Sequence, residues 1–439
     1  MDKQMLGYAR VEFSPDGPVD ISGGGVKANS VYEPIYATAA SFSQGDTRVL
    51  VVGVDLRNVN KNFLDVVLPM ITEATGVPQE AIYFHATHNH SAPDVQLYWL
   101  DSVKDWRDRI GIPAMVKAAV DAVADEKPIT GMSGGEAVTE NISYVRRYRR
   151  EDGTWQGIAY QVKNDSPLVS HETTADPTLR AVRIGREGGK DVIFVNFQTH
   201  AAQAYGQKRN MISADFVGHL RDKLEADTGC VMMYVQGACG NTNYLSKLEE
   251  EKTKMVYDYQ RVGQNLADYA QEALKNGKPM ELGKLQYRYG GVPCSVKHDK
   301  DHLCDAIDNI LDNEPDQEKQ RHMLLELGLG SRHEVGPVFK RRAWGETQLV
   351  EIAAFSLGDF AIAFAPFELF DTVAADFRAA SPYEMTFYSG YALDYMGYVP
   401  GQEVWNHGEY EVYMCHFHSG VGERTVLAQL KYLQDMKKN

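Results

Sequence analysis

The sequence predicts an α/β protein with a mixed β-sheet core flanked by helices. Three apolar stretches read as buried strands, and they run into the polar clusters THNH, THAAQ and GACGNTN. Stretches with helical periodicity separate them, and this alternation is typical of a sheet covered by helices. Strand ends are also where α/β proteins place their chemistry.

The predicted elements follow in order along the chain. Residues 1–60 contain strands and turns that end in TRVLVVGVDL, an apolar run that suits a central strand. Residues 64–75 and 102–125 show helical periodicity, as does SADFVGHLRDKLEAD between the second and third strands. The stretch TQLVEIAAFSLGDFAIAFAPFELF reads as a β-hairpin with a Gly-Asp turn, and it reaches the polar residue Glu368.

We interpret residues 1–439 as a single catalytic domain with a helical insertion at 296–335. The insertion is highly charged, and it fits either a cap over the site or a solvated helical pair. Its KHDKDHLCD segment places His298 and His302 four residues apart, on one face of a helix. A second metal site that includes Asp301 and Asp305 is therefore one hypothesis for this segment.

Composition restricts the class of protein and its partners. The net charge of −15 argues against binding to nucleic acid or to an anionic membrane surface. The 5 cysteines form no CxxC pair, so neither a disulfide framework nor a cysteine zinc site is expected. The sequence shows neither an apolar leader nor an apolar window long enough to span a membrane, so the predicted location is the cytoplasm. The expected partner is a small-molecule substrate, with no stable membrane association and with homo-oligomer formation left open.

The segment FHATHNHSAPD concentrates 3 of the 13 histidines of the chain. In extended backbone, the imidazoles of His88 and His90 would point to the same side. Such a pair suits two ligands of one metal, or one ligand beside one substrate contact. A surface loop with hydrogen-bonded histidines is the alternative.

Six motifs occur in a fixed order along the chain: THNHSAP, NFQTHAA, ISADFVG, VQGACGNTN, AFAPFE and DYMGYVPGQEV. Together they resemble the catalytic N-terminal domain of the neutral/alkaline (non-lysosomal) ceramidase family. The resemblance extends from YARVEFSP near the start to EYEVYMCHF near the end. It implies the fold of that domain and one Zn²⁺ per chain, whose ligands fall by motif on His88, His200, Glu368 and Tyr398.

The resemblance also implies catalytic roles. His90 corresponds to a proton donor or substrate contact beside the reacting carbonyl, and Tyr398 would help to transfer protons. Arg146 corresponds to a residue that holds the developing oxyanion, with Arg147 as the alternative one position on. Asp215 matches a buried carboxylate that either orients a histidine or caps the following helix. Substrate contacts are expected from Arg147, Asn241, Asn243 and Tyr395.

The chain departs from the ceramidase pattern in one loop. Where ceramidases carry a serine in a G-D-x-S-P pattern, Asn241 replaces the aspartate and Asn243 stands at the serine position. No covalent serine step is expected there. We therefore expect a divergent member that lacks both this serine and the family's C-terminal immunoglobulin-like domain.

These features lead to one functional hypothesis and three alternatives. The first is a zinc-dependent hydrolase that cleaves a linear amide (N-acyl) bond in a small or amphiphilic substrate by attack of zinc-bound water. The same ligands would suit an esterase or lactonase, or a Lewis-acid lyase or isomerase acting on a hydroxylated, sugar-like substrate. A non-catalytic binding protein on the same fold is the further alternative.

Overall fold

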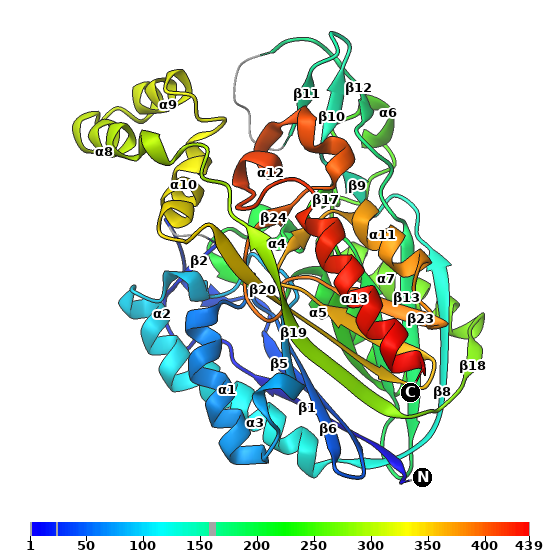
Figure 1. The fold of residues 1–439 in the computed structure, drawn as a ribbon. Coiled ribbons are helices and arrows are strands. Elements are labelled where there is room, and N and C mark those ends of the chain that lie inside the picture. Colours follow the sequence, from blue (N-terminus) through cyan, green and yellow to red (C-terminus); the bar gives the residue numbers. More distant parts are fainter. Residues whose placement is uncertain (1, 23–24, 158–163, 439) are drawn as a thin grey trace.

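A nine-stranded mixed sheet forms the larger half of the core in the computed structural model, which describes residues 2–22, 25–157 and 164–438 (Figure 1). Its two parallel pairs are β6 with β7 and β14 with β16, and its other pairs are antiparallel. Along the sheet the strands are β16 (Val231–Gln236), β14 (Val192–Phe197), β13 (Thr178–Arg186), β8 (Lys127–Val138), β1 (Gln4–Glu12), β5 (Tyr36–Gln44), β6 (Thr47–Val54) and β7 (Ile82–Ala86), with β18 (Lys278–Met280) paired to β8.

A four-stranded sheet packs against the first. It contains, in order, β19 (Leu285–Ser295), β20 (Thr347–Leu357), β21 (Phe360–Phe364) and β23 (Met385–Ser389). The hairpin predicted from the Gly-Asp turn is β20 and β21, which pair antiparallel. A core of large apolar side chains fills the space between the sheets, with Phe42 and Phe194 on one side and Phe355 and Phe360 on the other.

Helices cover the outer faces of both sheets, so the layers run helix, sheet, sheet, helix (Figure 1). The larger sheet is covered by α1 (Lys61–Thr75), α3 (Ile112–Ala124), α5 (Asp215–Thr228) and α7 (Tyr259–Lys275), and the smaller by α11 (Asp371–Ala379) and α13 (Val421–Lys438). This arrangement confirms the predicted mixed β-sheet core flanked by helices. Strands β7, β14, β21 and β23 are buried at every position because the sheets are covered on both sides there.

The segment between β19 and β20 is helical, as predicted for the insertion, and its helices continue past residue 335. It contains α8 (Cys304–Asn313), α9 (Gln317–Glu326) and α10 (Val335–Arg342), which share a small apolar core of their own. In Figure 1, α8 and α9 project away from the sheets at the upper left.

Shorter elements surround the edge of the sheets where the predicted site residues lie. The elements at this edge are β9 (Tyr144–Val145), β17 (Thr242–Asn243), β22 (Glu368–Leu369), β24 (Tyr398–Val399) and α12 (Glu409–Met414). Other short elements lie elsewhere in the fold: β2 (Val19–Ile21), β3 (Val26–Ala28), β4 (Ser30–Val31), β10 (Tyr148–Arg150), β11 (Trp155–Gln156), β12 (Leu168–His171), β15 (Met211–Ile212), α2 (Asp101–Trp106), α4 (Gln203–Gln207) and α6 (Glu249–Lys252). Among the described residues, no helix combines the length and the apolar character needed to cross a membrane.

Candidate metal centre

Four backbone segments bring the predicted metal ligands together. His88 and His90 follow the end of β7, and His200 follows the end of β14. Glu368 begins β22, which pairs in parallel with β24 so that Glu368 stands directly opposite Tyr398. The apolar strands therefore fix the positions from which these polar side chains extend.

The Nε2 atoms of three imidazoles converge on one point. His88 Nε2 lies 3.0 Å from His200 Nε2 and 3.3 Å from His90 Nε2. Within the described residues, these three histidines are the one group of at least three histidine, cysteine or acidic side chains arranged to hold a metal ion. The structure thus adds His90 to the imidazoles that face the predicted metal position.

Backbone carbonyls define which imidazole nitrogens are free. His88 Nδ1 donates to the carbonyl of Arg57 at 2.8 Å, and His200 Nδ1 donates to the carbonyl of Cys239 at 2.9 Å. Because a carbonyl oxygen only accepts, the proton of each neutral ring is on Nδ1 and each Nε2 carries the lone pair. Two such lone pairs 3.0 Å apart repel each other, and a cation between them would relieve the repulsion.

The backbone at His88 differs from the extended conformation considered for the sequence. Its φ angle is 61°, in the left-handed region that non-glycine residues seldom adopt. The side chains of His88 and His90 nevertheless meet through their Nε2 atoms. An unusual backbone conformation next to a cluster of polar groups is typical of functional sites.

Burial keeps the imidazoles neutral. Desolvation lowers the pKa values of His88 and His200 well below the ordinary histidine value, and it lowers the pKa of His90 to about 3. Neutral imidazole is the form that binds a metal ion. His88 and His200 are buried, whereas His90 is half-buried and marks the side on which the site opens.

Glu368 completes the group of potential ligands. Its Oε2 atom lies 3.5 Å from His88 Nε2 and 3.6 Å from His200 Nε2. Tyr395 donates to Oε1 at 2.5 Å and Tyr391 donates to Oε2 at 3.3 Å, so both carboxylate oxygens are held. Burial raises the pKa of Glu368, against the opposite effect of the nearby Arg146 guanidinium.

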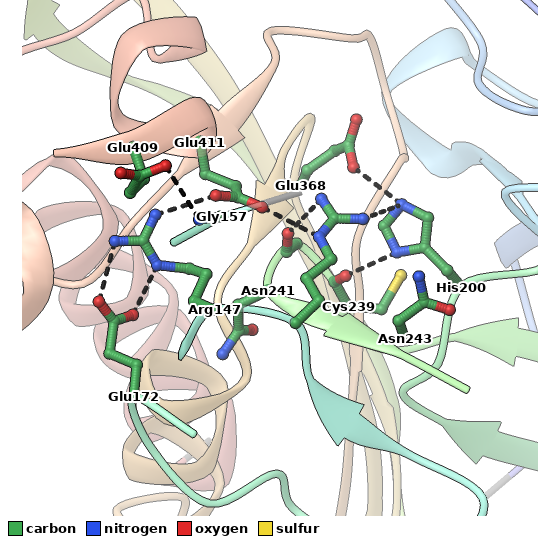
Figure 2. A network of polar contacts seen from close by, with 12 residues as sticks. Arg147, Gly157, Glu172, His200, Cys239, Asn241, Asn243, Glu368, Glu409 and Glu411 are labelled. Carbon is green, nitrogen blue, oxygen red and sulfur yellow. Dashed lines mark hydrogen bonds and ion pairs between the residues drawn. The ribbon is translucent and has the colours of Figure 1, made fainter. Parts of the chain in front are cut away.

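Arg146 reaches the same point from β9 and the loop that follows it. Its Nη1 lies 3.1 Å from His200 Nε2, its Nε donates to Glu411 at 2.9 Å, and its Nη2 donates to the carbonyl of Gly240 at 2.8 Å (Figure 2). The guanidinium carbon also lies 5.5 Å from the centre of the buried Tyr398 ring. Arg146, rather than Arg147, therefore contacts the histidines.

Arg147 pairs with acidic side chains inside the protein. Its guanidinium is fully buried and pairs with Glu172 through Nε and Nη2 and with Glu411 through Nη1 (Figure 2). It also donates twice to the carbonyl of Gly408. These partners engage its three nitrogens inside the protein, and the substrate contact of Arg147 stays a prediction.

The two asparagines of the GACGNTN loop also separate in the structure. Asn241 is fully buried and pairs with Asp371 through both ends of its amide, at 2.6 and 2.9 Å, and its substrate contact stays a prediction. Asn243 is half-buried, and its Oδ1 accepts from the backbone N–H of Tyr244 at 2.8 Å. It offers no nucleophile at the position where ceramidases carry serine.

Of the two roles considered for Asp215, the contacts support capping of the following helix, because Asp215 begins α5 and accepts from an N–H of its first turn. Its carboxylate accepts from the backbone N–H groups of Ala204 and Phe216, both at 2.7 Å, and it contacts no histidine among these bonds. Burial raises its pKa to about 7. Asp215 therefore fixes the loop that follows His200 to the start of α5.

The second metal site hypothesised in the insertion is not formed. His298 Nδ1 pairs with Asp301 at 2.7 Å, and His302 is exposed. No group of three potential ligands gathers there in the described part of the chain. The solvated-helix interpretation fits this segment.

Several site residues escaped the sequence interpretation. Tyr391 donates to Glu368 and stacks on His88, with ring centres 4.0 Å apart, and Glu411 bridges the two arginines. The carbonyl groups of Arg57 and Cys239 orient the imidazoles. The dense tyrosines around residue 398 were the one available signal for Tyr391.

Comparison with known proteins shows the fold. The structure titled "Crystal Structure Analysis of neutral ceramidase from Pseudomonas aeruginosa" has a TM-score of 0.71 and 17% sequence identity, with 99% of this chain and 74% of that chain covered. The structure titled "Ceramidase complexed with C2" has a TM-score of 0.70 and 15% identity, with 99% and 75% covered. No protein-family model and no curated protein sequence matches the chain. The chain thus has a neutral-ceramidase-like fold, and its activity has to be inferred from the site.

Proposed function

We propose that this chain is a zinc-dependent hydrolase that cleaves an amide (N-acyl) bond in a small or amphiphilic substrate. The observation that carries the proposal is the convergence of neutral imidazole nitrogens and the Glu368 carboxylate at one buried point. Imidazole and carboxylate donors in this combination suit Zn²⁺. The ceramidase-like fold supports the same reaction class, because ceramidases are amide hydrolases.

In this proposal His88, His200, Glu368 and Tyr398 hold the ion. A bound zinc ion would supply Lewis acidity toward a substrate carbonyl. The tyrosines that donate to Glu368 keep its carboxylate oriented, and the carbonyls at Nδ1 keep both histidines in the ligating tautomer. The site is thereby preorganised before any substrate enters.

Two further residues act on the substrate. Arg146 directs a guanidinium into the site and would stabilise negative charge that develops on the carbonyl oxygen. His90, which is neutral and half-buried, would take up the proton released by the attacking water and pass it to the departing amine. Its position next to His88 also fits a third imidazole ligand, and the two roles differ in one result: His90→Ala retains zinc if His90 is a proton donor and loses it if His90 is a ligand.

The test is hydrolysis of matched N-acyl and ester substrates by protein that is zinc-loaded, chelated and then reloaded. We expect release of free amine from N-acyl compounds, loss of activity on chelation and recovery with zinc. Arg146→Gln should lower kcat about 100-fold or more while zinc stays bound. Turnover of esters or lactones alone would favour the esterase alternative, and fully zinc-loaded protein without any acyl hydrolysis would contradict the proposal.

A further inference from the structure

A chain of buried charges leads away from the histidines toward α12. Arg146 Nε donates to Glu411 Oε1 at 2.9 Å, and Arg147 Nη1 donates to Glu411 Oε2 at 2.9 Å (Figure 2). On its other edge, the Arg147 guanidinium donates to Glu172 through Nε at 2.6 Å and through Nη2 at 2.9 Å. Two guanidinium and two carboxylate groups alternate, so the chain is neutral as a whole.

Glu411 is the centre of this chain and has no access to solvent. Its exposed fraction is 0%, and each carboxylate oxygen holds a different arginine. Charged hydrogen bonds of this kind are strong and directional. The Nε bond fixes one edge of the Arg146 guanidinium, which leaves Nη1 directed at His200.

The start of α12 is also fixed by Arg147. The carbonyl of Gly408 accepts from Arg147 Nη1 at 3.2 Å and from Nη2 at 3.1 Å. Gly408 and Glu409 both have positive φ angles, 65° and 71°, so the backbone enters the helix through a constrained turn. Arg147 thus holds both the backbone before Glu411 and its carboxylate.

From this geometry, and resting on the function proposed above, we propose that Glu411 is a positioning residue that aims the Arg146 guanidinium at the reacting carbonyl. Arg147 and Glu172 act behind it by fixing and neutralising its carboxylate. Among the described residues, the hydrogen bonds and ion pairs of the Glu411 carboxylate go to Arg146 and Arg147 and not to a metal ligand, so its effect on the reaction passes through Arg146.

A double-mutant cycle of Glu411→Gln and Arg146→Gln tests this role. Glu411→Gln should lower kcat about 10- to 100-fold with a smaller change in KM, because a displaced guanidinium loses its alignment with the reacting group. In the Arg146→Gln background the same substitution should change kcat less than threefold. Equal losses in both backgrounds, or loss of bound zinc in Glu411→Gln, would show that Glu411 acts on the fold or on the metal and would overturn the proposal.

Two variants provide controls. Glu409→Gln removes a carboxylate from the same helix that contacts the backbone of Gly157 rather than an arginine, and it should leave kcat within threefold. Glu411→Asp keeps the charge but is too short to reach both arginines, so it should lower kcat even if Glu411→Gln fails to fold. Unchanged kcat in a folded Glu411→Asp protein would also overturn the proposal.

Hydrogen exchange of the arginine Nε–H groups gives an answer that needs no activity. In protein labelled with ¹⁵N-arginine, the Nε–H resonance of Arg146 is the one that Arg146→Gln removes. It should be protected from exchange in the wild type and in Glu409→Gln, and unprotected in Glu411→Gln. An unprotected wild-type resonance would overturn the role of Glu411. If the wild type hydrolyses nothing, the proposed function fails, and this exchange result alone decides whether Glu411 holds Arg146.

Discussion

Two tyrosine hydroxyls hold Glu368, one at each carboxylate oxygen. Tyr395 makes the shorter bond, at 2.5 Å, and it is half-buried. The sequence interpretation assigned Tyr395 to substrate binding, and the structure adds this contact with a potential ligand. Residues that orient a metal ligand commonly affect metal affinity almost as strongly as the ligand itself.

Tyr395→Phe should therefore weaken zinc binding about 10- to 100-fold, because the substitution frees one oxygen of Glu368 and changes little else. The zinc dissociation constant, measured by competition with a chromophoric chelator, checks this. Tyr257→Phe, at a largely exposed ring, is the matched control and should leave the constant unchanged. An equal constant in wild type and Tyr395→Phe would exclude a role for this hydroxyl at the metal.

At the residue scale, the sequence was informative where a motif alone specifies a position. The convergence of His88, His200 and Glu368 follows from motif order, although the three residues are far apart in the chain. The buried pairings of Arg147 and Asn241 were not predicted, because their partners, Glu411 and Asp371, lie 264 and 130 residues away. No local pattern shows that a polar side chain is already paired inside the protein.

At the scale of elements, one close approach connects the GACGN loop to β22. Gly240 donates its backbone N–H to Leu369 at 2.9 Å, and a Cβ atom on Gly240 would lie 2.3 Å from the carbonyl oxygen of Glu368. The loop that carries Gly240 therefore determines how far β22 extends toward the histidines. Only glycine allows this distance.

Gly240→Ala should displace β22 and with it Glu368. We expect a loss of about 1–3 kcal/mol in the free energy of unfolding from the steric conflict, together with weaker zinc binding. Urea unfolding and the zinc dissociation constant measure the two effects. Gly131→Ala, where an added Cβ has open space, is the control and should change neither. Unaltered zinc affinity in Gly240→Ala would contradict the link between the loop and Glu368.

The order of elements was easier to predict than their local backbone. Apolar strands that end in polar clusters predicted which segments meet at the site. The left-handed conformation of His88 and the short parallel pair of β22 and β24 were not predicted, because tertiary contacts impose them. Neither leaves a periodic pattern in the sequence.

At the scale of the whole molecule, the two packed sheets bury a histidine whose ring is not hydrogen-bonded within the described part of the chain. His85 lies on β7 and pairs with Ala392 through an isolated bridge; no partner for either ring nitrogen is found among the described residues. Burial lowers its pKa to about 3. The sequence predicted a sheet covered by helices but did not distinguish one sheet from two, because a strand buried under a helix and one buried under a sheet are equally apolar.

His85 should make the fold less stable in acid. The unfolded chain takes up a proton near pH 6.5, whereas the folded protein resists it until about pH 3, so stability falls as pH drops from 6.5 toward 3. Between pH 7 and pH 5, His85 lowers the free energy of unfolding by about 2 kcal/mol. When urea unfolding is measured at both pH values, the fall in the free energy of unfolding from pH 7 to pH 5 should be smaller in His85→Leu than in wild type by about this amount. The exposed His322→Leu should behave as wild type, and an unchanged pH dependence in His85→Leu would refute the assignment.

The central claim is that His88 and Glu368, from different sheets and nearly three hundred residues apart, hold one zinc ion. Metal content by plasma mass spectrometry on wild type, His88→Ala, Glu368→Ala and the surface control His322→Ala tests it most directly. We predict about one zinc per chain in wild type and in the control, and far less in the two site variants. Wild-type protein that binds no zinc when it is supplied, or zinc retained in both site variants, would contradict the account.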